Sequence, residues 1–187
     1  MAGREPGCLA SGSIRFRLSF RSGWQPLVSF GGFGDQGRFE DVQACDLQTQ
    51  TWQDLVPEGG PVRRCLLTAA FDPAARRMII FGGQSNVQSR HNDLWVFDFA
   101  TNSWTEAPAD APPSGHFFTA SFVDSGEFFI VFGGSTSSGN SNETWSYDFR
   151  GGQWTRLEIS NPPSARSGMA GTLVGEDRLI IFSGSGA

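Results

Sequence analysis

A repeat of about fifty residues is the feature that most restricts the fold of this chain. Phe30-Gly31-Gly32 recurs as Phe81-Gly82-Gly83 and as Phe132-Gly133-Gly134, at offsets of 51 and 51 residues, and a degenerate copy, Phe182-Ser183-Gly184, follows 50 residues later. Each intact doublet is followed after 14 or 15 residues by an aspartate and six residues later by a tryptophan, at Asp46, Asp98, Asp148, Trp52, Trp104 and Trp154. A fixed period of this length indicates stacked supersecondary units.

Each repeat predicts four short β-strands. Apolar and polar residues alternate from Ile14 to Arg21, which is the pattern of a strand with one buried face. The second strand of every repeat is an apolar run that ends at the glycine doublet, and the four runs are 27–30, 78–81, 128–132 and 179–182. The later runs are apolar on both faces, as expected for strands that lie between neighbouring sheets. The sequence therefore predicts an all-β fold.

The recurring glycines, aspartates and tryptophans have predicted structural roles. Glycine permits a positive φ and a close backbone approach where a strand must end beside its neighbour. An aspartate at the end of the third strand, such as Asp98, can accept backbone N–H bonds in the following turn. The tryptophans are large enough to fill the space between twisted sheets.

This set of residues resembles the kelch repeat, in which a hydrophobic strand ends in Gly-Gly and an aromatic-Asp step precedes a tryptophan. The resemblance extends from about residue 11 to residue 187. It departs from the pattern at Gln43 and Cys45, where later repeats carry aromatic residues, and at Ser183, where the first glycine is expected. The resemblance implies a kelch-type β-propeller in which each repeat forms one four-stranded blade.

The strand count predicts an incomplete propeller. Residues 1–10 are expected to be disordered, and residues 11–187 to form complete blades at about 14–55, 65–107 and 116–157, with only the inner half of a fourth at about 166–184. Propellers ordinarily have four to eight blades. We therefore expect a fragment of a larger propeller, or a chain that borrows strands from a partner, and the unpaired strand edge predicts self-association.

Charge and cysteine content exclude several classes of protein. All 14 basic residues are arginine, and the net charge of −5 argues against nucleic acid as a main partner. No run of 18 apolar residues occurs, so no transmembrane helix and no membrane partner are expected. Cys8, Cys45 and Cys65 are odd in number and lack metal-binding spacing, which argues against a disulfide framework or structural zinc. We expect idle thiols in a reducing compartment and a cytoplasmic location.

No catalytic or metal-binding constellation is evident in the sequence. The chain has two histidines, His91 and His116, and one tyrosine, Tyr147. Some propellers that resemble kelch are copper-radical oxidases, which need several tyrosines and histidines around one metal. Plant specifier proteins built on kelch repeats use an acid-x3-Asp-x3-His iron motif, which neither histidine matches. We therefore expect no catalysis, no metal and no cofactor.

Two sets of long connections are predicted to form one surface around the channel mouth. Second-to-third-strand loops span about 33–40, 84–92 and 135–142, and fourth-to-first-strand loops span about 56–63, 108–115 and 158–165. Both sets should emerge on the same side of an up-and-down blade, and loops on a rigid scaffold are where binding residues concentrate. The candidate partner-binding residues in or beside these loops are Arg38, Arg64, Asn86, Arg90, His91, His116, Asn140 and Arg166.

Arginines near a channel mouth can hold a carboxylate with two hydrogen bonds, which favours a protein or peptide partner of acidic character. Arg64, His116 and Arg166 recur at one place in the repeat, so a structural hydrogen-bonding role competes with partner binding at these positions. The loop residues Arg38, Arg90 and His91 do not recur in register and are better candidates for specificity.

The sequence therefore favours a non-catalytic protein–protein interaction module. Kelch propellers are diverse in use, and the resemblance includes substrate adaptors of ubiquitin ligases and actin-associated scaffolds. The alternative is an enzyme or carbohydrate-binding propeller whose site residues lie on blades missing from this chain. A non-functional gene fragment is a third hypothesis.

Overall fold

The computed structural model describes residues 14–17, 27–46, 48–114, 119–124, 126–174 and 178–186. These residues form β-strands, turns and loops, and no helix occurs among them. The predicted all-β fold is confirmed. No helix that could cross a membrane is found in the described part of the chain. The predictions of a disordered segment at residues 1–10 and of a partner contact at His116 lie outside the described residues.

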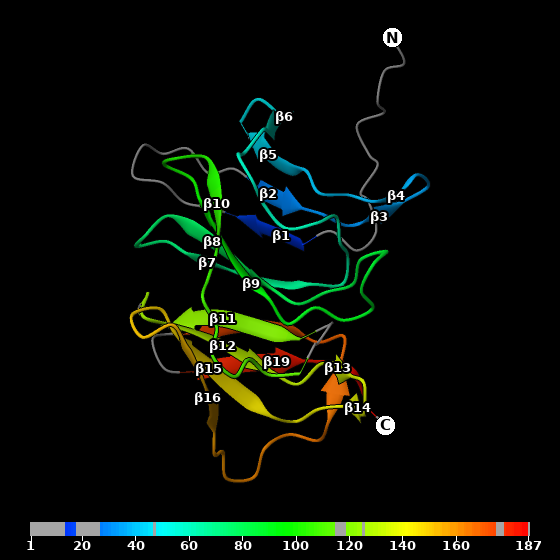
Figure 1. The fold of residues 1–187 in the computed structure, drawn as a ribbon, viewed down its shortest axis with the longest axis vertical. Coiled ribbons are helices and arrows are strands. Elements are labelled where there is room, and N and C mark those ends of the chain that lie inside the picture. Colours follow the sequence, from blue (N-terminus) through cyan, green and yellow to red (C-terminus); the bar gives the residue numbers. More distant parts are fainter. Residues whose placement is uncertain are drawn as a thin grey trace.

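Three antiparallel sheets of four strands, which we call blades 1 to 3, follow one another along the chain (Figure 1). Blade 1 has the strand order β1 (Ile14–Arg17), β2 (Leu27–Phe30), β5 (Val42–Asp46), β6 (Thr51–Leu55). Blade 2 contains β7 (Thr68–Asp72), β8 (Arg77–Phe81), β9 (Leu94–Asp98) and β10 (Ser103–Glu106), again in sequence order. Blade 3 contains β11 (Ala120–Asp124), β12 (Phe128–Phe132), β15 (Thr144–Asp148) and β16 (Gln153–Leu157).

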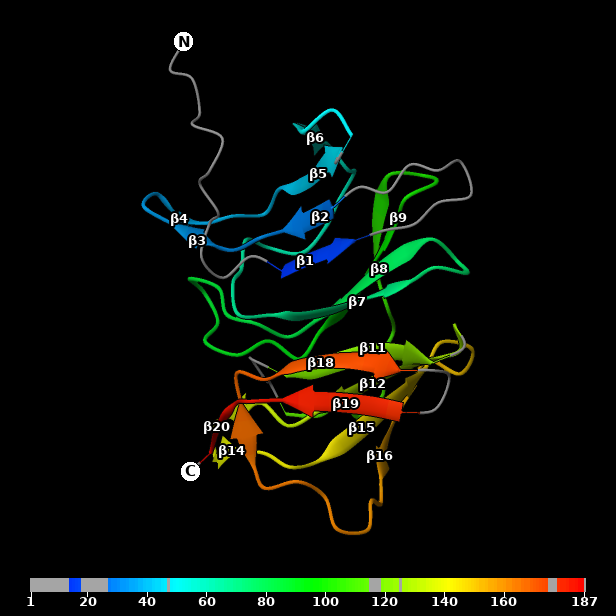
Figure 2. The same ribbon diagram turned by 180° about the vertical axis from the view of Figure 1, so that it is seen from behind.

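A fourth sheet has only two of the expected strands. In it β18 (Ala170–Val174) pairs with β19 (Arg178–Phe182), and both are seen side by side in Figure 2. Six further strands form three pairs of two-residue strands: β3 (Phe33–Gly34) with β4 (Gly37–Arg38), β13 (Ser135–Thr136) with β14 (Gly139–Asn140), and β17 (Arg166–Ser167) with β20 (Ser185–Gly186). The first two pairs lie within segments that the sequence analysis assigned to long loops.

The first strands of the blades lie next to one another. Strand β7 lies beside both β1 and β11, and β11 also lies beside β18. Figures 1 and 2 show the sheets layered face to face along this row. This is the arrangement that a propeller requires, with each first strand nearest the axis.

Tryptophans fill the spaces between adjacent blades, as predicted. Trp104 of blade 2 lies 5.0 Å, centroid to centroid, from Phe30 of blade 1. Trp154 of blade 3 lies 5.0 Å from Phe81 of blade 2. Both indoles are buried at the centre of an apolar cluster that joins two blades. The interface between blades is therefore built twice from the same pair of side chains.

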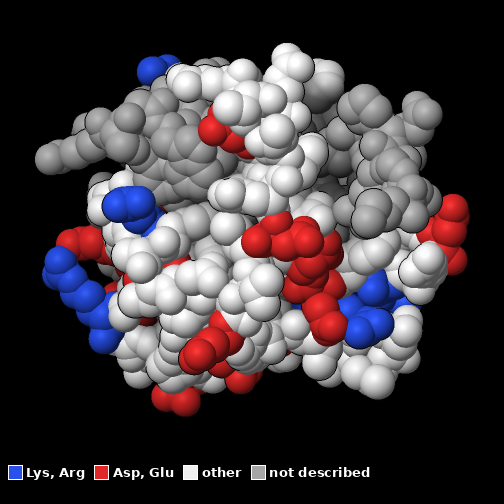
Figure 3. Space-filling model, turned by 90° about the horizontal axis from the view of Figure 1, so that it is seen from above, with Lys and Arg blue, Asp and Glu red and all other residues white. Residues whose placement is uncertain are grey.

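Trp52 does not follow this pattern, because 47% of its surface is exposed. It lies on the outer strand of blade 1, and no described blade precedes blade 1 to cover that face. Figure 3 views the blade 1 end of the molecule, where charged side chains form separate small patches and much of the visible described surface is uncharged.

Aspartates at the ends of the third strands close the turns that follow them. Asp98 Oδ1 accepts hydrogen bonds from the N–H groups of Ala100 and Thr101, at 2.6 and 3.2 Å. Asp46 and Asp148 do the same in their own turns. The predicted role of these aspartates is confirmed.

The glycine doublets connect each blade to the linker that leads into the next blade. The Gly32 N–H donates to the Arg64 carbonyl at 2.9 Å, and the Gly134 N–H donates to the Arg166 carbonyl at the same distance. Gly31 has a φ of +62°, and a Cβ there would come within 2.6 Å of the Arg64 carbonyl oxygen. The doublet is thus required both for its backbone conformation and for the close approach of a second backbone segment.

Candidate functional site

The second-to-third-strand loops gather on one side of the molecule, which we call the loop face. It comprises residues 33–40, 84–92 and 135–142, and it lies on the right in Figure 1. The described β7–β8, β9–β10 and β15–β16 turns lie on the opposite side. The sequence predicted that these loops share one side with the fourth-to-first-strand loops.

Arg38 joins two loops of this face. Its guanidinium donates to Asn86 Oδ1, and also to Gln84 Oε1 at 2.9 Å, so the β3–β4 hairpin of blade 1 is tied to the loop of blade 2. The guanidinium also lies 5.7 Å from the ring centroid of Phe33. The sequence placed Arg38 and Asn86 on one surface, and the structure brings them into contact.

Two apolar side chains project from these tied loops. Phe33 is 50% exposed and Val87 is 85% exposed. Between them lie the contacts of Arg38 with Phe33 on one side and with Asn86 on the other. The loop face therefore presents apolar groups around an arginine whose side chain is already held in place.

Asn140 makes the corresponding link on the other side of the loop face. Its Nδ2 group donates to the carbonyl of Ser185 at 2.9 Å, which connects the β13–β14 hairpin of blade 3 to β20. Arg38 and Asn140 each end a two-residue hairpin, and each reaches the next sheet along the chain. Both residues therefore stabilise the shape of the loop face, in addition to any contact with a partner.

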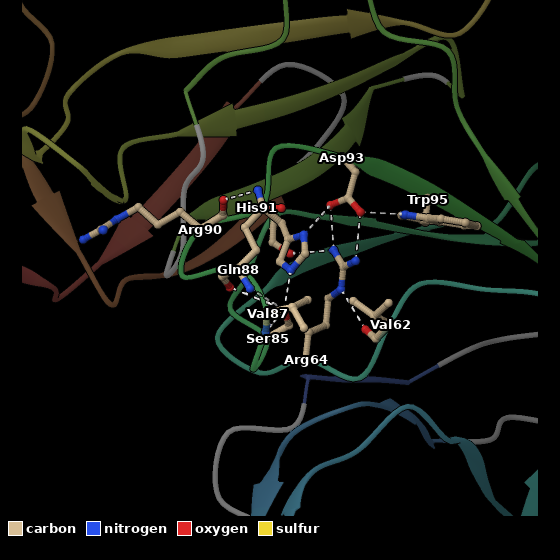
Figure 4. A network of polar contacts seen from close by, with 10 residues as sticks. Val62, Arg64, Ser85, Val87, Gln88, Arg90, His91, Asp93 and Trp95 are labelled. Atoms are coloured by element: carbon tan, nitrogen blue, oxygen red, sulfur yellow. Dashed lines mark hydrogen bonds and ion pairs between the residues drawn. The ribbon is translucent and has the colours of Figure 1, made fainter.

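Arg64 lies inside the protein and not on the loop face (Figure 4). Its side chain is 1% exposed and forms a bidentate ion pair with Asp93, with N···O distances of 2.6 and 2.8 Å. It also donates to the carbonyls of Gly82 and Val62. These contacts occupy four of the five N–H donors of a buried guanidinium, so we remove Arg64 from the partner-binding set and assign it the structural role.

His91 is also buried, and it lies between Ser85 and Asp93. His91 Nε2 is 2.9 Å from Ser85 Oγ, and His91 Nδ1 is 3.9 Å from Asp93 Oδ1. The residue order Ser–His–Asp invites comparison with a catalytic triad, which needs an exposed nucleophile and a histidine hydrogen-bonded to the acid.

The geometry does not support nucleophilic catalysis at Ser85. The hydroxyl is buried and accepts hydrogen bonds from the N–H groups of Val87 and Gln88. The 3.9 Å separation between His91 and Asp93 exceeds a hydrogen bond, and the Asp93 carboxylate is held by Arg64 and by the Trp95 indole N–H. The arrangement instead fixes the path of the 84–92 loop.

The two titratable groups of this network have shifted pKa values. Burial, and then the positive charge of Arg64, lower the pKa of His91, although the Asp93 carboxylate partly opposes them. Burial acts to raise the pKa of Asp93, but hydrogen bonds and charge from Arg64 outweigh it and lower that pKa. The lowered pKa favours a neutral His91, whose Nε2 lies within hydrogen-bond distance of the Ser85 hydroxyl.

The lowered pKa of His91 predicts a loss of stability in mild acid. Because the folded pKa lies below the ordinary value of 6.5, the unfolded chain binds more protons near pH 6, and the free energy of unfolding should fall as the pH drops below about 7. Chemical denaturation at several pH values measures this. The His91→Gln variant should lose the dependence in that range. Asp93 contributes a separate loss below about pH 4, which the His91→Gln variant should retain. Identical pH profiles for His91→Gln and the unaltered chain would contradict the assignment.

Arg90 and Arg166 occupy different settings. Figure 4 shows the Arg90 side chain extending away from the His91 network, while its carbonyl accepts from Gln88 Nε2. Arg166 is partly exposed, and its guanidinium contacts the Ser164 hydroxyl and the carbonyls of Ser164 and Ser183. Both remain candidates for partner contact.

A hollow of about 450 Å³ lies on the side opposite the loop face, among the turns of blades 2 and 3. Its charged groups satisfy one another: Arg77 donates to the buried Asp72 at 2.9 Å and stacks 3.9 Å from the Phe149 ring centroid. At its mouth Arg150 pairs with Glu127. Paired charges leave little attraction for a charged ligand.

The described residues include no group of three or more His, Cys, Asp and Glu side chains that could hold a metal ion. The hydroxyl of Tyr147 forms a hydrogen bond within the protein, because it donates to the Pro108 carbonyl at 2.6 Å. Burial and the nearby Asp148 carboxylate raise the pKa of Tyr147, which disfavours its ionised form.

Comparison with known proteins identifies the repeat. Residues 24–187 match the model of the KLHDC2/KLHL20/DRC7 kelch-repeats domain. The chain belongs to the kelch-repeat family. The family architecture is a β-propeller, and kelch repeats are typically protein-interaction modules.

Several curated kelch relatives match about three fifths of the chain. A flagellar outer-arm dynein alpha chain of Chlamydomonas reinhardtii is 34% identical over 124 residues, which are 60% of this chain and 3% of the dynein. Acyl-CoA-binding domain-containing protein 5 of Arabidopsis thaliana is 33% identical over 118 residues, 60% of this chain and 18% of that protein. Kelch domain-containing protein 2 of Bos taurus is 29% identical over 113 residues, 58% of this chain and 27% of that protein. The chain thus spans only a small part of the relatives that it matches.

Sequence reasoning missed two members of the buried network. Asp93 had a detectable signal, because it falls in register with Glu143, and both acids accept from the indole N–H of the tryptophan two residues later. Ser85 had a weaker signal, because the residue 51 positions later is Thr136, whose hydroxyl likewise accepts from the N–H two residues on.

Proposed function

We propose that this kelch-repeat chain is a non-catalytic interaction module that binds a protein partner through the loop face. The observation that carries the proposal is the exposure of Phe33 and Val87 on two loops that Arg38 ties together. Exposed apolar side chains on rigid loops lose little conformational freedom on binding, so they contribute efficiently to an interface.

Arg38 and Arg90 supply the polar part of the proposed surface. Arg38 is held beside Phe33, and its guanidinium can exchange the neutral Asn86 oxygen for a stronger carboxylate acceptor. This supports the proposal of an acidic partner. A cytoplasmic location and self-association are further proposals, which rest on the cysteine content and on the unpaired strand edge.

Substitution of Val87 tests the loop face. Proteins captured by the immobilised chain would be quantified by mass spectrometry for the unaltered chain, Val87→Asp, Phe33→Ser and Ala100→Asp. A charge at the centre of an apolar contact should reduce capture of a true partner about tenfold, which corresponds to the loss of an interface hot spot. Ala100 is exposed on the opposite side, in the β9–β10 turn, so Ala100→Asp should leave capture unchanged.

Thermal unfolding must be similar for all four proteins, which shows that the comparison reports binding and not folding. If Val87→Asp and Phe33→Ser capture every protein as well as the unaltered chain does, the loop-face proposal is wrong.

A further inference from the structure

His91 contacts a turn in the loop that joins β8 to β9. Ser85 Oγ accepts hydrogen bonds from the N–H groups of Val87 and Gln88, at 3.2 and 3.0 Å, and the Ser85 N–H donates to the Gln88 carbonyl at 2.9 Å. His91 Nε2 lies 2.9 Å from the same hydroxyl oxygen. The imidazole therefore touches the side chain that closes this turn.

The turn carries an exposed apolar side chain of the loop face. Val87 is 85% exposed, and its neighbour Asn86 accepts a hydrogen bond from the Arg38 guanidinium of blade 1. The second hydrogen bond of Arg38, to Gln84 at 2.9 Å, reaches the residue directly before the turn. The conformation of residues 85–88 therefore fixes both the position of Val87 and one of the contacts that tie blade 1 to blade 2.

Two charged groups face the imidazole, and both come from outside the turn (Figure 4). Arg64 lies in the linker between blades 1 and 2, Asp93 directly precedes β9, and their charges act in opposite directions on His91. His91 Nδ1 is 3.9 Å from Asp93 Oδ1, and the Asp93 carboxylate is held by Arg64 and by the Trp95 indole N–H.

The other ionisable groups of these segments are engaged elsewhere or carry no charge. Arg63 of the linker is 56% exposed and pairs with Glu40, and the linker thiol of Cys65 is buried. The Arg90 side chain extends away from the imidazole in Figure 4, and residues 84–89 contain no charged side chain. A change of charge at His91 therefore acts mainly on the turn, on Arg64 and on Asp93.

A proton on His91 conflicts with this set of contacts. An imidazolium carries hydrogen on both ring nitrogens, so its Nε2–H would have to donate to Ser85 Oγ. A hydroxyl oxygen has two acceptor sites, and the two backbone N–H groups of the turn occupy them. Arg64 would repel the new charge, and Asp93 would draw it toward a carboxylate that already accepts three hydrogen bonds. Protonation therefore weakens the turn.

Blade 3 contains a corresponding turn without a histidine. Thr136 takes the place of Ser85, and its Oγ1 accepts from the Ser138 N–H at 3.1 Å. Ser141 takes the place of His91, because the N–H of each residue donates to the carbonyl of the second glycine of its own doublet. The turn can thus form without an imidazole, and His91 adds a group that can change charge near neutral pH.

We propose that His91 is a pH-dependent switch of the loop face: uncharged, it holds residues 85–88 in the conformation that presents Val87, and on protonation it releases them. Mild acid should therefore weaken binding through the loop face. This consequence for binding rests on the proposed function, whereas the release of the turn does not.

Amide hydrogen exchange measured by NMR follows the turn in the absence of any partner. Protection factors, which correct for the intrinsic pH dependence of exchange, would be measured between pH 7.5 and pH 4.5 on the 187-residue chain. We expect the protection of the Val87 and Gln88 amides to fall about tenfold or more, with the same midpoint as the titration of the His91 imidazole. The Ser138 amide of blade 3 is the matched control and should keep its protection.

The His91→Gln variant separates His91 from other effects of acid. Glutamine does not take up a proton, so the protection of the Val87 and Gln88 amides should no longer depend on pH in this range. Unchanged protection in the unaltered chain, an equal loss at Ser138, or a loss that persists in His91→Gln would each overturn the proposal. If that variant is unstable, the agreement of the two midpoints in the unaltered chain decides the question.

Capture by the immobilised chain tests the consequence for binding. Proteins whose capture depends on Val87 should be retained about tenfold less at pH 5 than at pH 7.5, and the difference should disappear for His91→Gln. If Val87→Asp does not reduce capture at either pH, the proposed function fails and the exchange result is unaffected. If capture depends on Val87 but not on pH, although the amides respond, the proposal that His91 controls binding is wrong.

Discussion

Replacing Arg64 by methionine is expected to lower the free energy of unfolding by about 3 kcal/mol, near the lower end of the effect of breaking a buried ion pair. The substitution leaves the Asp93 carboxylate without its bidentate partner and the carbonyls of Gly82 and Val62 without their side-chain donor. Asp93 keeps 21% exposure, so water can compensate in part, which is why we expect the lower end. Urea denaturation measures the change.

The neighbouring Arg63 provides the control. It pairs with Glu40 at 2.8 Å, but 56% of its side chain is exposed, so Arg63→Met should cost less than about 1 kcal/mol. The double variant Arg64→Met with Asp93→Leu removes both buried charges and should recover part of the stability lost by Arg64→Met alone. Equal losses for Arg64→Met and Arg63→Met would refute the structural role of Arg64.

Replacing Gly31 by alanine is expected to cost about 3 kcal/mol, from two causes that act together. The φ of +62° is strained for alanine, which accounts for about 1 kcal/mol. The added Cβ would also lie 2.6 Å from the Arg64 carbonyl oxygen, so the backbone that enters blade 2 must move. The change should appear as a lower denaturation midpoint with an unchanged slope.

Gly59 separates the two causes. Its φ of +66° is almost the same as that of Gly31, but no atom lies within 4 Å of a Cβ built there. Gly59→Ala should therefore cost only about 1 kcal/mol. If the two substitutions prove equally costly, the close approach of the two backbones does not contribute to the requirement for glycine at residue 31.

The architecture could be predicted from sequence because the recurring residues act through short-range chemistry or through bulk. Asp98 closes its turn with backbone groups only two and three residues away, and Trp104 buries an indole wherever two sheets meet. Neither role depends on a particular distant partner. A fixed spacing along the chain was therefore sufficient to assign them.

The site could be predicted only in part, because its contacts join residues that are distant in sequence. Arg38 contacts Asn86, 48 residues later in the sequence, and Arg64 contacts Asp93, 29 residues later. No local sequence pattern predicts which of these arginines will be exposed. Arg64 and Arg166 have the same sequence context, yet one is buried and the other partly exposed. Among the described residues, a third strand with its acid lies beside Arg64 and none lies beside Arg166.

The departure at Ser183 also has a physical reason. This residue takes a φ of 66°, the conformation that glycine adopts in the earlier doublets. Ser183 is exposed, so its Cβ has room that the crowded Gly31 position does not offer. Only the conformational cost remains, and a small polar residue can accept that cost.

The bonds from the glycine doublets have a consequence for the order in which the protein loses structure. Gly32 and Gly134 each donate to a carbonyl of the linker that enters the succeeding sheet, so the end of one sheet is closed only when its successor is in place. Dependence between sheets is therefore directional: opening of the β18–β19 sheet should release the end of blade 3 before it affects blade 1.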